Sequence, residues 1–504
     1  MKTAPTPVLP SGGFSLVRTE TRRSFYFCRL KRASMGRKSK SFLAEGVPIH
    51  GMADKGRGVG RTTEGLVVFV EGTVPGDVAD VWVFKQRGGF AEGRLEHLRQ
   101  PSPQRVAPFC SHFSVCGGCK WQHLDYTAQL AHKQQTVVDA FERIAKVPVG
   151  EFLPMLAAPQ TTHYRNKLEF AFSNRRWRLT HEMAEAAAEA PQPALGFHRA
   201  GAFDKVVDIQ TCWLQAEPSN LIRNTARAIA LEQGLDFYDM RRQQGFLRHL
   251  MLRITTTGEV LALFSFGYSD LPAIERYLDA LIERVGQHLT TVVYCINPKL
   301  NDSMLDLDTV VYAGKGFVVE RLDDLQFKIG PKSFFQTNST QAKALYDTAL
   351  SFAGLTGRER VFDLYTGAGS IALYVARHCQ QVVGIEEVPE AIADAEENRR
   401  LNGIANARFY VGDVKELLTP AFVAQHGQPE VVITDPPRAG MHERAVRFLL
   451  QLEAPRLVYI SCNPATQARD MQLLAEKYDV QRVQPVDMFP HTHHIESVAL
   501  LVRR

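Results

Sequence analysis

Three short segments near the C-terminus carry side chains suited to covalent catalysis. Asp435 ends one apolar run, Cys462 follows another, and Glu496 opens the last one. A thiolate can attack a conjugated ring, and a carboxylate beside it can then remove a proton. An ordinary cysteine of the sheet core is the competing interpretation of Cys462. Rival bases come from a histidine cluster that would also suit a solvated loop: His491, His493 and His494.

A second group of residues indicates a nucleoside-binding site. An apolar run and the glycine-rich turn after it contain Asp363, Tyr365, Gly367, Gly369 and Ser370. A strand, a glycine turn and a helix bring backbone N–H groups to a ligand at the carboxyl edge of a sheet. Glu386 ends the next apolar run and can accept both ribose hydroxyls. Asp413 follows the third run and can meet the adenine edge.

A nicotinamide-dependent dehydrogenase would use a similar acid and is the alternative for this site. The turn Gly367-Ala-Gly369-Ser370 lacks the third glycine of the Gly-x-Gly-x-x-Gly pattern. Acids at the ends of successive strands suit a nucleoside that carries an amino acid, so the residues favour S-adenosylmethionine. An α/β domain whose glycines merely turn the chain is the remaining interpretation.

Three of the eight cysteines lie within ten residues of one another: Cys110, Cys116 and Cys119. Cysteines this sparse exclude a disulfide scaffold, and their spacing indicates a metal or iron–sulfur site. A closed cluster needs four thiolates, and Cys212, in a polar loop, is the expected fourth. Zinc is the competing metal, although one Cys-x2-Cys pair and two scattered cysteines are not a typical zinc ribbon. Unliganded buried cysteines are the third interpretation.

The elements that must position these residues fall into three parts. Short strands broken by glycines between about residues 46 and 85 indicate a small β-barrel. A strand-rich mixed region is expected over 160–320, and short apolar strands alternate with helices after Arg360, which is typical of a doubly wound parallel sheet. Between them a helix is expected over 125–146, with an apolar face made by Leu130, Val137, Ala140, Phe141 and Ile144.

Composition excludes several classes of protein. The chain has 504 residues, of which 22% are charged, and no apolar run approaches the roughly 18 residues that a membrane helix needs. No secretory signal is visible, so a cytoplasmic protein is expected. The net charge of +5 conceals a basic segment over 1–40, with ten basic residues and one acid. That segment indicates a polyanionic partner or a solvated disordered tail.

Several motifs together resemble the RNA uracil-C5 methyltransferase family. Four of them are Phe334-Phe-Gln-Thr-Asn338, Asp435-Pro-Pro-Arg438, Ser461-Cys-Asn-Pro464 and His494-Ile-Glu496. The segment from Cys110 to His123 is similar to the iron–sulfur segment of that family, and residues 46–103 are similar to its TRAM RNA-binding barrel. The resemblance runs from about residue 40 to the end of the chain.

The resemblance implies an α/β fold with a Rossmann-like S-adenosylmethionine-dependent methyltransferase domain. An N-terminal TRAM β-barrel, which is OB-like, and a central mixed α+β iron–sulfur domain would precede it. The expected boundaries are a disordered basic tail at 1–43, the barrel at 44–103, the central iron–sulfur and RNA-binding domain at 104–325, and the catalytic domain at 326–504.

The resemblance also implies residue roles. Cys462 would attack uracil C6, and C5 would then take the methyl group of S-adenosylmethionine. Glu496 would remove the C5 proton, and Asp435 would hold the uracil edge or the cofactor amine. The other cofactor-binding residues would be Asp363, Gly367, Gly369, Gln336, Tyr365, Ser370, Glu386 and Asp413, although relatives commonly have Asn in place of Ser370. A 4Fe-4S cluster would be held by Cys110, Cys116, Cys119 and Cys212.

The expected substrate is a uridine in a loop of 23S ribosomal RNA. A barrel with a complete cysteine set resembles the branch of the family that acts on this RNA, whereas the transfer RNA branch usually lacks both. We expect a monomer without a membrane partner. The alternatives are methylation of transfer RNA, an inactive RNA-binding or folding factor, and an exocyclic-amine methyltransferase. The last needs no thiol and has an aromatic residue where this chain has Arg438.

Overall fold

The computed structural model describes residues 41–178 and 192–504. The expected basic tail therefore lies outside the described residues, except for its last three positions. Phe42 and Leu43 are already part of a strand, so the first sheet begins two residues before the expected start at 44. No helix in the described part of the chain is long and apolar enough to cross a membrane.

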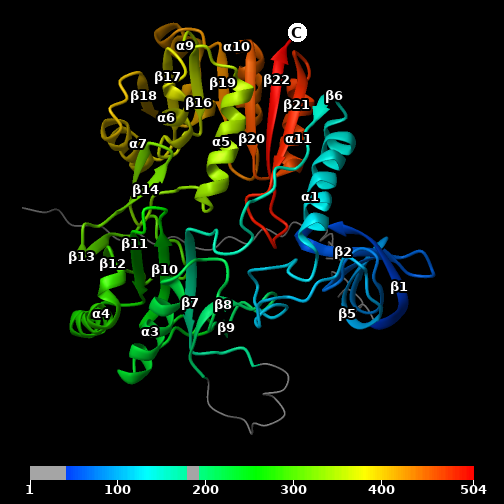
Figure 1. Ribbon diagram of the computed structural model, residues 1–504, viewed down its shortest axis with the longest axis vertical. Helices are drawn as coiled ribbons and strands as arrows, with labels where there is room; N and C mark the ends of the chain where they lie inside the picture. The colour runs from blue at the N-terminus through cyan, green and yellow to red at the C-terminus, as the bar shows by residue number, and fades with distance from the viewer. Residues whose placement is uncertain (1–40, 179–191) are drawn as a thin grey trace, which may run out of the picture. The chain divides into compact units, whose positions relative to one another are not determined.

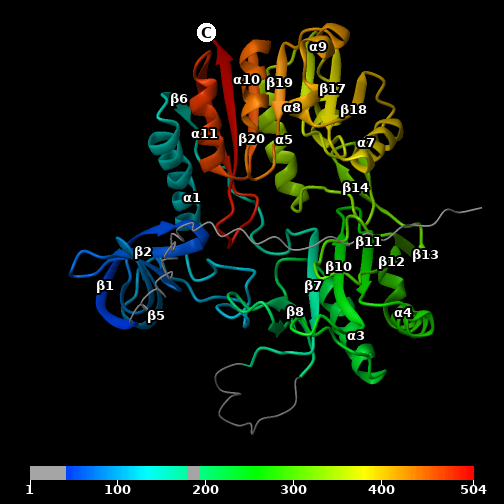
Figure 2. The same cartoon turned by 180° about the vertical axis from the view of Figure 1, so that it is seen from behind.

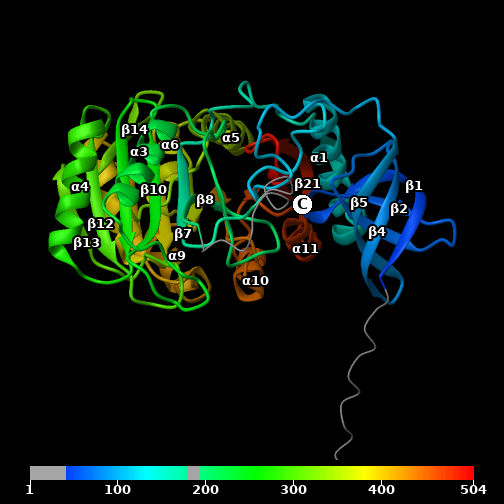
Figure 3. The same ribbon diagram turned by 90° about the horizontal axis from the view of Figure 1, so that it is seen from below.

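The first element group is a closed five-stranded barrel with the order β1-β2-β3-β5-β4. Alternating small apolar residues fill its interior, and Ile49, Val68 and Val81 are almost completely buried. Trp121, just before α1, donates its indole N–H to Gly56 O of the barrel at 3.2 Å, and Figure 3 shows the barrel beside α1. Its strands are β1 (Phe42–Ala53), β2 (Arg57–Arg61), β3 (Val67–Glu71), β4 (Val78–Arg87) and β5 (Phe90–Gln100).

The expected helix over 125–146 is present as α1 (Tyr126–Ala140), capped by Asp125 and continued by one π turn. Its buried face differs from the expected one. Ile144 is exposed, whereas Gln129 and Lys133 are completely buried. The periodicity of apolar residues therefore located the helix correctly but missed two polar side chains on the face that packs inward.

The central region is built on a mixed seven-stranded sheet with the order β13-β12-β11-β10-β7-β8-β9. Helices α3 (Ser219–Glu232) and α4 (Leu271–Val285) pack against it through Ile222, Ile274 and Leu278. The strands are β7 (Lys167–Ser173), β8 (Ala194–His198), β9 (Val206–Asp208), β10 (Leu247–Ile254), β11 (Val260–Phe266), β12 (Thr291–Ile296) and β13 (Thr309–Gly314).

The C-terminal sheet has eight strands in the order β18-β17-β16-β19-β20-β22-β21-β6, and the first five are parallel. Edge strand β6 (Val149–Phe152) comes from before the central region and pairs with β21. The strands are β16 (Arg360–Leu364), β17 (Gln381–Glu386), β18 (Ala407–Val411), β19 (Val431–Thr434), β20 (Arg456–Ser461), β21 (Tyr478–Val486) and β22 (Glu496–Arg503).

Helices cover both faces of this sheet, as Figures 1 and 2 show from opposite sides. One face packs against α5 (Ser339–Ala353), α6 (Ser370–Ala376) and α7 (Pro389–Leu401). The other packs against α1, α8 (Val414–Leu417), α9 (Pro420–His426), α10 (Glu443–Leu452) and α11 (Pro464–Leu474).

A two-stranded hairpin adds to the first of these faces. It consists of β14 (Val318–Leu322) and β15 (Leu325–Ile329), and its apolar side chains belong to the same core as α5 to α7. The expected boundary between the central and catalytic parts, at 325/326, thus falls inside β15.

Candidate active site at the strand ends

The carboxyl ends of the parallel strands gather the expected site residues at one edge of the sheet. Asp435 follows β19 and Cys462 follows β20. Because β22 is antiparallel to β20, with Ser461 opposite Ser497, its first residue Glu496 lies at the same edge as Cys462. The edge where α/β sheets bind ligands therefore carries the thiol and both acids.

The turn after β16 has an unusual backbone. Tyr365, Gly367 and Gly369 all have positive φ values, of 64°, 56° and 78°. This conformation is cheap for glycine and costs a side-chain-bearing residue such as Tyr365 roughly 1 kcal/mol or more. The backbone N–H of Gly367 donates to the Glu386 carboxylate at 3.1 Å. The turn and the acid at the end of β17 are thus held together at the same edge.

Of the remaining expected cofactor residues, Ser370 belongs to this turn and Asp413 lies close enough to act on the pKa of Tyr365, whereas Gln336 contacts the central region. Ser370 begins α6 and shares a 2.8 Å hydrogen bond with the hydroxyl of Tyr346. Gln336 is buried, and its backbone carbonyl accepts a hydrogen bond from Asn166. Asp413 caps α8, and its hydrogen bond with Lys415 holds the pKa of its carboxyl below the usual value. A ligand that contacts Asp413 therefore competes with Lys415.

Three acids at this edge have raised pKa values because the protein buries them. Burial raises the pKa of Asp363 to about 7 and that of Asp435 to about 7. Burial, with Asp435 nearby, raises the pKa of Glu496 well above its usual value. Asp435 and Asp363 repel one another's charged forms. Carboxyl groups crowded in this way favour a cation as their ligand.

Burial and neighbouring charge also act on the cysteine of the site. The pKa of the partly buried Cys462 thiol is raised to about 11, first by burial and then by Glu496 and Asp435. Arg438 opposes this shift through its charge and a hydrogen bond to the thiol. A cation next to a thiol favours the reactive thiolate.

Arg438 belongs to the Asp-Pro-Pro-Arg motif, but no role for its side chain was expected from the sequence. Its guanidinium lies 3.3 Å from His494 Nδ1, and its backbone carbonyl accepts hydrogen bonds from Asn463 and Thr466. These contacts hold it between the cysteine loop and the segment that leads to Glu496. The signal in the sequence was an arginine where an exocyclic-amine methyltransferase would have an aromatic residue after Pro-Pro.

The four cysteines of the expected cluster line one cavity of about 440 Å³. Cys116 and Cys119 are so shielded from water that their thiol pKa values are raised to about 12. Across residues 41–178 and 192–504, no three His, Cys, Asp or Glu side chains come together tightly enough to hold a single metal ion. The same cavity reaches the catalytic edge, where its wall includes Arg438, Phe489 and His494.

A buried guanidinium stands beside these thiols. Arg223 is fully buried and donates to Gln210 O at 2.6 Å and to Asn220 Oδ1 at 2.9 Å. The same Asn220 oxygen accepts the backbone N–H of Cys212. Within the described residues Arg223 makes no salt bridge to a carboxylate. Its charge lowers the pKa of Cys212 against the larger effect of burial, so it favours the thiolate there.

Comparisons with known proteins agree with this architecture. Residues 308–504 match the family described as tRNA (Uracil-5-)-methyltransferase, and residues 46–95 match the TRAM domain. The chain is 49% identical to an uncharacterized RNA methyltransferase of Bacteroides thetaiotaomicron, over 90% of this chain and all of that protein. It is also 49% identical to one of Porphyromonas gingivalis, over 90% of this chain and 99% of the other.

A solved structure extends this likeness to the fold. The tRNA (uracil-54, C5)-methyltransferase of Pyrococcus abyssi, in complex with S-adenosyl-L-homocysteine, is 29% identical to this chain, with a TM-score of 0.69. The match covers 90% of this chain and 99% of the other. A catalytic C-terminal domain, a TRAM barrel and relatives along almost the whole length establish one conclusion: the chain belongs to the S-adenosylmethionine-dependent RNA uracil-5-methyltransferase family.

Proposed function

We propose that this protein methylates C5 of a uridine in 23S ribosomal RNA through a covalent adduct between Cys462 and uracil C6. The observation that carries the proposal is the meeting of Cys462, Asp435 and Glu496 at one edge of the sheet, with Arg438 beside the thiol. A thiol, a cation that favours its ionised form and a shielded base are the groups that this chemistry needs.

In the proposed reaction, Cys462 acts first as the nucleophile and last as the leaving group, and Glu496 acts as the base between these two steps. The Cys462 thiol gives its proton to solvent, the thiolate sulfur forms a bond to C6, and the C5=C6 electrons move onto the ring as an enolate. S-adenosylmethionine, when bound, supplies the methyl group to C5 as an electrophile and leaves as S-adenosylhomocysteine. Glu496 then takes the proton from C5, the C5=C6 bond re-forms, and the Cys462 sulfur leaves C6. Uracil C5 is too weak a nucleophile without the adduct, so this order follows from the ring's own chemistry.

Glu496 is a better base for this step than the histidines next to it. Burial lowers the pKa values of His491 and His494 to about 4, so both are neutral but weakly basic. The same shielding raises the pKa of Glu496, which makes its carboxylate a stronger base. Asp435, between Glu496 and Asp363, would hold the uracil edge or the cofactor amine.

The acidic edge also fits the cofactor. S-adenosylmethionine carries a sulfonium and an ammonium group. Asp363 is buried and Asp435 half-buried, and a cation would favour the ionised form of both carboxyls, whose pKa values are raised. Glu386 lies beside the glycine turn, and its second oxygen accepts the Val388 N–H at 3.1 Å and has a further lone pair for a ribose hydroxyl. We propose the same pocket for Gln336, Tyr365, Ser370, Asp413, Gly367 and Gly369. A side chain added at Gly367 would meet nothing within 4 Å, so the turn is open to a ligand.

We also propose that Cys110, Cys116, Cys119 and Cys212 hold a 4Fe-4S cluster. Two observations support the fit: all four line one cavity, and the buried Arg223 stands next to Cys212 without a carboxylate partner among the described residues. Thiolates around a cluster are farther apart than thiolates around one ion, which is consistent with the absence of a tight single-ion site in the described residues. A cluster with four thiolates carries net negative charge, which Arg223 would offset.

Two observations bear on the RNA substrate. The barrel and the cysteine set together favour ribosomal RNA, as in the branch that has both. A transfer RNA is the second candidate, because the Pyrococcus abyssi enzyme, which aligns over 90% of this chain, is named for uridine 54 of tRNA. We also propose that the protein acts as a monomer.

One experiment separates these substrates. The protein, purified without oxygen, is incubated with labelled S-adenosylmethionine and either unmodified 23S rRNA or bulk tRNA, and the RNA is digested to nucleosides for mass spectrometry. We expect labelled 5-methyluridine from 23S rRNA alone. Label in tRNA would keep the chemistry and overturn the substrate. No label in either RNA, with RNA still bound, would identify a binding or folding factor instead.

The cluster has its own test. Iron and sulfide are measured in the anaerobic protein, in Cys212→Ser and in Cys379→Ala, which removes a buried thiol elsewhere in the fold. We expect about four iron atoms per chain in the unchanged protein and in Cys379→Ala, and loss of most iron in Cys212→Ser. Equal metal content in all three would remove Cys212 from the site, and zinc in place of iron would overturn the cluster.

A further inference from the structure

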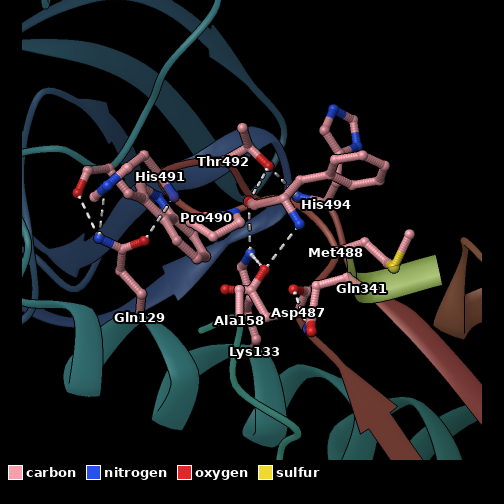
Figure 4. A network of polar contacts seen from close by, with 12 residues as sticks. Gln129, Lys133, Ala158, Gln341, Asp487, Met488, Pro490, His491, Thr492 and His494 are labelled. Carbon is pink, nitrogen blue, oxygen red and sulfur yellow. Dashed lines mark hydrogen bonds and ion pairs between the residues drawn. The ribbon is translucent and has the colours of Figure 1, made fainter. Parts of the chain in front are cut away.

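The loop that delivers Glu496 is held by side chains far away in the sequence. It spans residues 487–495 and joins β21 to β22, so its last residue directly precedes Glu496. Figure 4 shows Gln129 and Lys133 pointing from α1 toward it. Both α1 side chains are completely buried and four residues apart, which places them on one face of the helix.

Lys133 fixes the start of this loop. Its ammonium donates to Asp487 Oδ1 at 2.6 Å and to Phe489 O at 3.0 Å, and both side chains of the ion pair are fully buried. Asp487 Oδ1 also accepts the backbone N–H of Phe489 at 3.1 Å. From the other side Gln341 donates to Asp487 O at 2.9 Å. The ion pair thus closes a turn three residues long.

Gln129 fixes the middle of the loop. Its Oε1 accepts the backbone N–H of His491 at 2.9 Å, and its Nε2 lies 3.2 Å from His491 Nδ1. The same Nε2 is 3.0 Å from Trp121 O and 2.8 Å from Leu124 O, so its two N–H groups face three acceptors. The backbone carbonyl of His491 accepts from Lys120 and Trp121 at 2.8 and 3.0 Å.

His491 needs this support because its backbone is strained. Its φ of 63° lies in the left-handed region, which a side-chain-bearing residue adopts only when the surroundings fix it. Beyond His491 the loop continues through the Thr492 hydroxyl, which accepts the N–H of His494 at 3.2 Å. His494 then contacts Arg438, which faces the Cys462 thiol. The loop therefore sets both the base and the cation of the site.

We propose that Gln129 and Lys133 are positioning residues for proton removal from C5, because they fix the 487–495 loop that presents Glu496 to the adduct. The inference rests on the proposed function. It also gives α1 a role. Apolar packing alone would not need fully buried polar side chains on this helix, and their hydrogen bonds to the loop explain why they are there. Lys120 directly follows Cys119, so the cysteine segment and the base are tied to the same residue, His491.

The test separates adduct formation from product release. Gln129→Met keeps the volume and removes every hydrogen bond, and Gln135→Met is the control, since Gln135 is exposed on α1 and contacts Asp139. The substrate is the RNA that the unchanged protein methylates. Rapid-quench kinetics measure two species, the covalent RNA–protein adduct and the released RNA that contains 5-methyluridine. For Gln129→Met we expect the rate of adduct formation and the KM values for RNA and S-adenosylmethionine to stay within about threefold of the unchanged protein. We expect release of the methylated RNA to slow at least about tenfold.

A double variant protects the test against simple misfolding. Lys133→Met with Asp487→Leu removes both buried charges together, a replacement that commonly leaves stability intact. We expect the same slow release at an unchanged melting temperature. Two results would overturn the positioning role. One is equal slowing of adduct formation and product release together with a lower melting temperature, and the other is a release rate equal to that of Gln135→Met. Failure of the proposed function looks different, because the unchanged protein itself would then form no methylated adduct.

Discussion

At the scale of single residues, the reacting groups are controlled by burial more than by direct pairing. Burial and the neighbouring carboxyls raise the pKa of the Cys462 thiol to about 11, although Arg438 beside it favours the ionised form. The same shielding raises the pKa values of Glu496 and Asp435, so each carboxyl binds a proton more tightly than an exposed one. Such raised carboxyl pKa values cost folding free energy and are typical of catalytic positions.

The first prediction concerns the nucleophile. We expect Cys462→Ala to fold, to bind RNA and S-adenosylmethionine, and to lose methyl transfer by at least about 10³-fold, because no other group can activate C5. The melting temperature should change little, since the thiol is only partly buried. Transfer of labelled methyl groups and filter binding of RNA measure the two properties on one sample. Turnover close to that of the unchanged protein would remove Cys462 from the mechanism.

The second prediction concerns the base. In Glu496→Gln the amide cannot accept the C5 proton, so we expect the methylated RNA to stay covalently attached to Cys462. Denaturing gels with RNA and protein labelled separately would show the species, and mass spectrometry would show its methyl group. Release at the normal rate would mean that another group, such as His494, takes the proton.

The third prediction is a pH dependence of cofactor binding. The carboxyls of Asp363 and Asp435, with pKa values of about 7, are neutral below that pH and charged above it. A sulfonium cation prefers the charged forms, so the affinity for S-adenosylmethionine should rise between pH 6 and 8, by up to about tenfold per titrating group and pH unit. Calorimetry at each pH measures the affinity for S-adenosylmethionine and for S-adenosylhomocysteine, which lacks the sulfonium charge, and so gives the ratio of the two affinities. Asp435→Asn should flatten the rise for S-adenosylmethionine. An equal rise for both ligands would assign the effect to the ammonium group, which both ligands carry, and overturn the role of the sulfonium.

At the scale of elements, strand ends and helix starts position the site. Asn338 at the start of α5 accepts the N–H of Gln341 at 3.2 Å and donates to Met488 O in the 487–495 loop at 3.0 Å. The Asn338 side chain therefore both caps the N-terminus of α5 and holds the loop before Glu496.

The fourth prediction follows from that double contact. Asn338→Ala should lower the free energy of unfolding by about 1–3 kcal/mol, because it removes a helix cap and leaves a buried carbonyl unpaired. Asn338→Ser can restore the cap but not the reach to Met488, so we expect it to recover about half of the loss. Chemical denaturation measures both. Equal stability of Asn338→Ser and the unchanged protein would show that the contact with Met488 contributes nothing.

The parallel strands and their reactive ends were predictable, since β16, β17, β19 and β20 are apolar runs that each end near a polar residue. The buried polar face of α1 was not. Periodicity counts apolar residues, and Lys133 is buried because Asp487, 354 residues later, neutralises it. Pairing of β6 with β21 is equally non-local. The sequence pattern predicts individual helices and strands. Contacts between polar residues that are far apart in the sequence cannot be predicted from it and become known only from the structure.

At the scale of the whole described chain, three parts meet on a short stretch of backbone. Trp121 donates its indole N–H to Gly56 of the barrel and its backbone N–H to His491 of the catalytic loop. Cys119, the third cysteine of the expected cluster segment, lies two residues before Trp121. The barrel and the loop that precedes Glu496 therefore share direct hydrogen bonds through one residue.

The last prediction tests the barrel as an RNA-binding surface. Arg61 and Arg87 are exposed, and the strand register places both in one row across β2, β3, β5 and β4, with Val67 and the aromatic Phe90 between them. Contacts with phosphates release counterions, so Arg61→Ala with Arg87→Ala should weaken RNA binding and reduce the slope of log affinity against log salt by up to about 2. Methyl transfer at saturating RNA should stay unchanged. Arg447→Ala, an exposed arginine on α10 paired with Glu443, is the control. A salt slope equal to that of this control would place the phosphate contacts elsewhere on the protein.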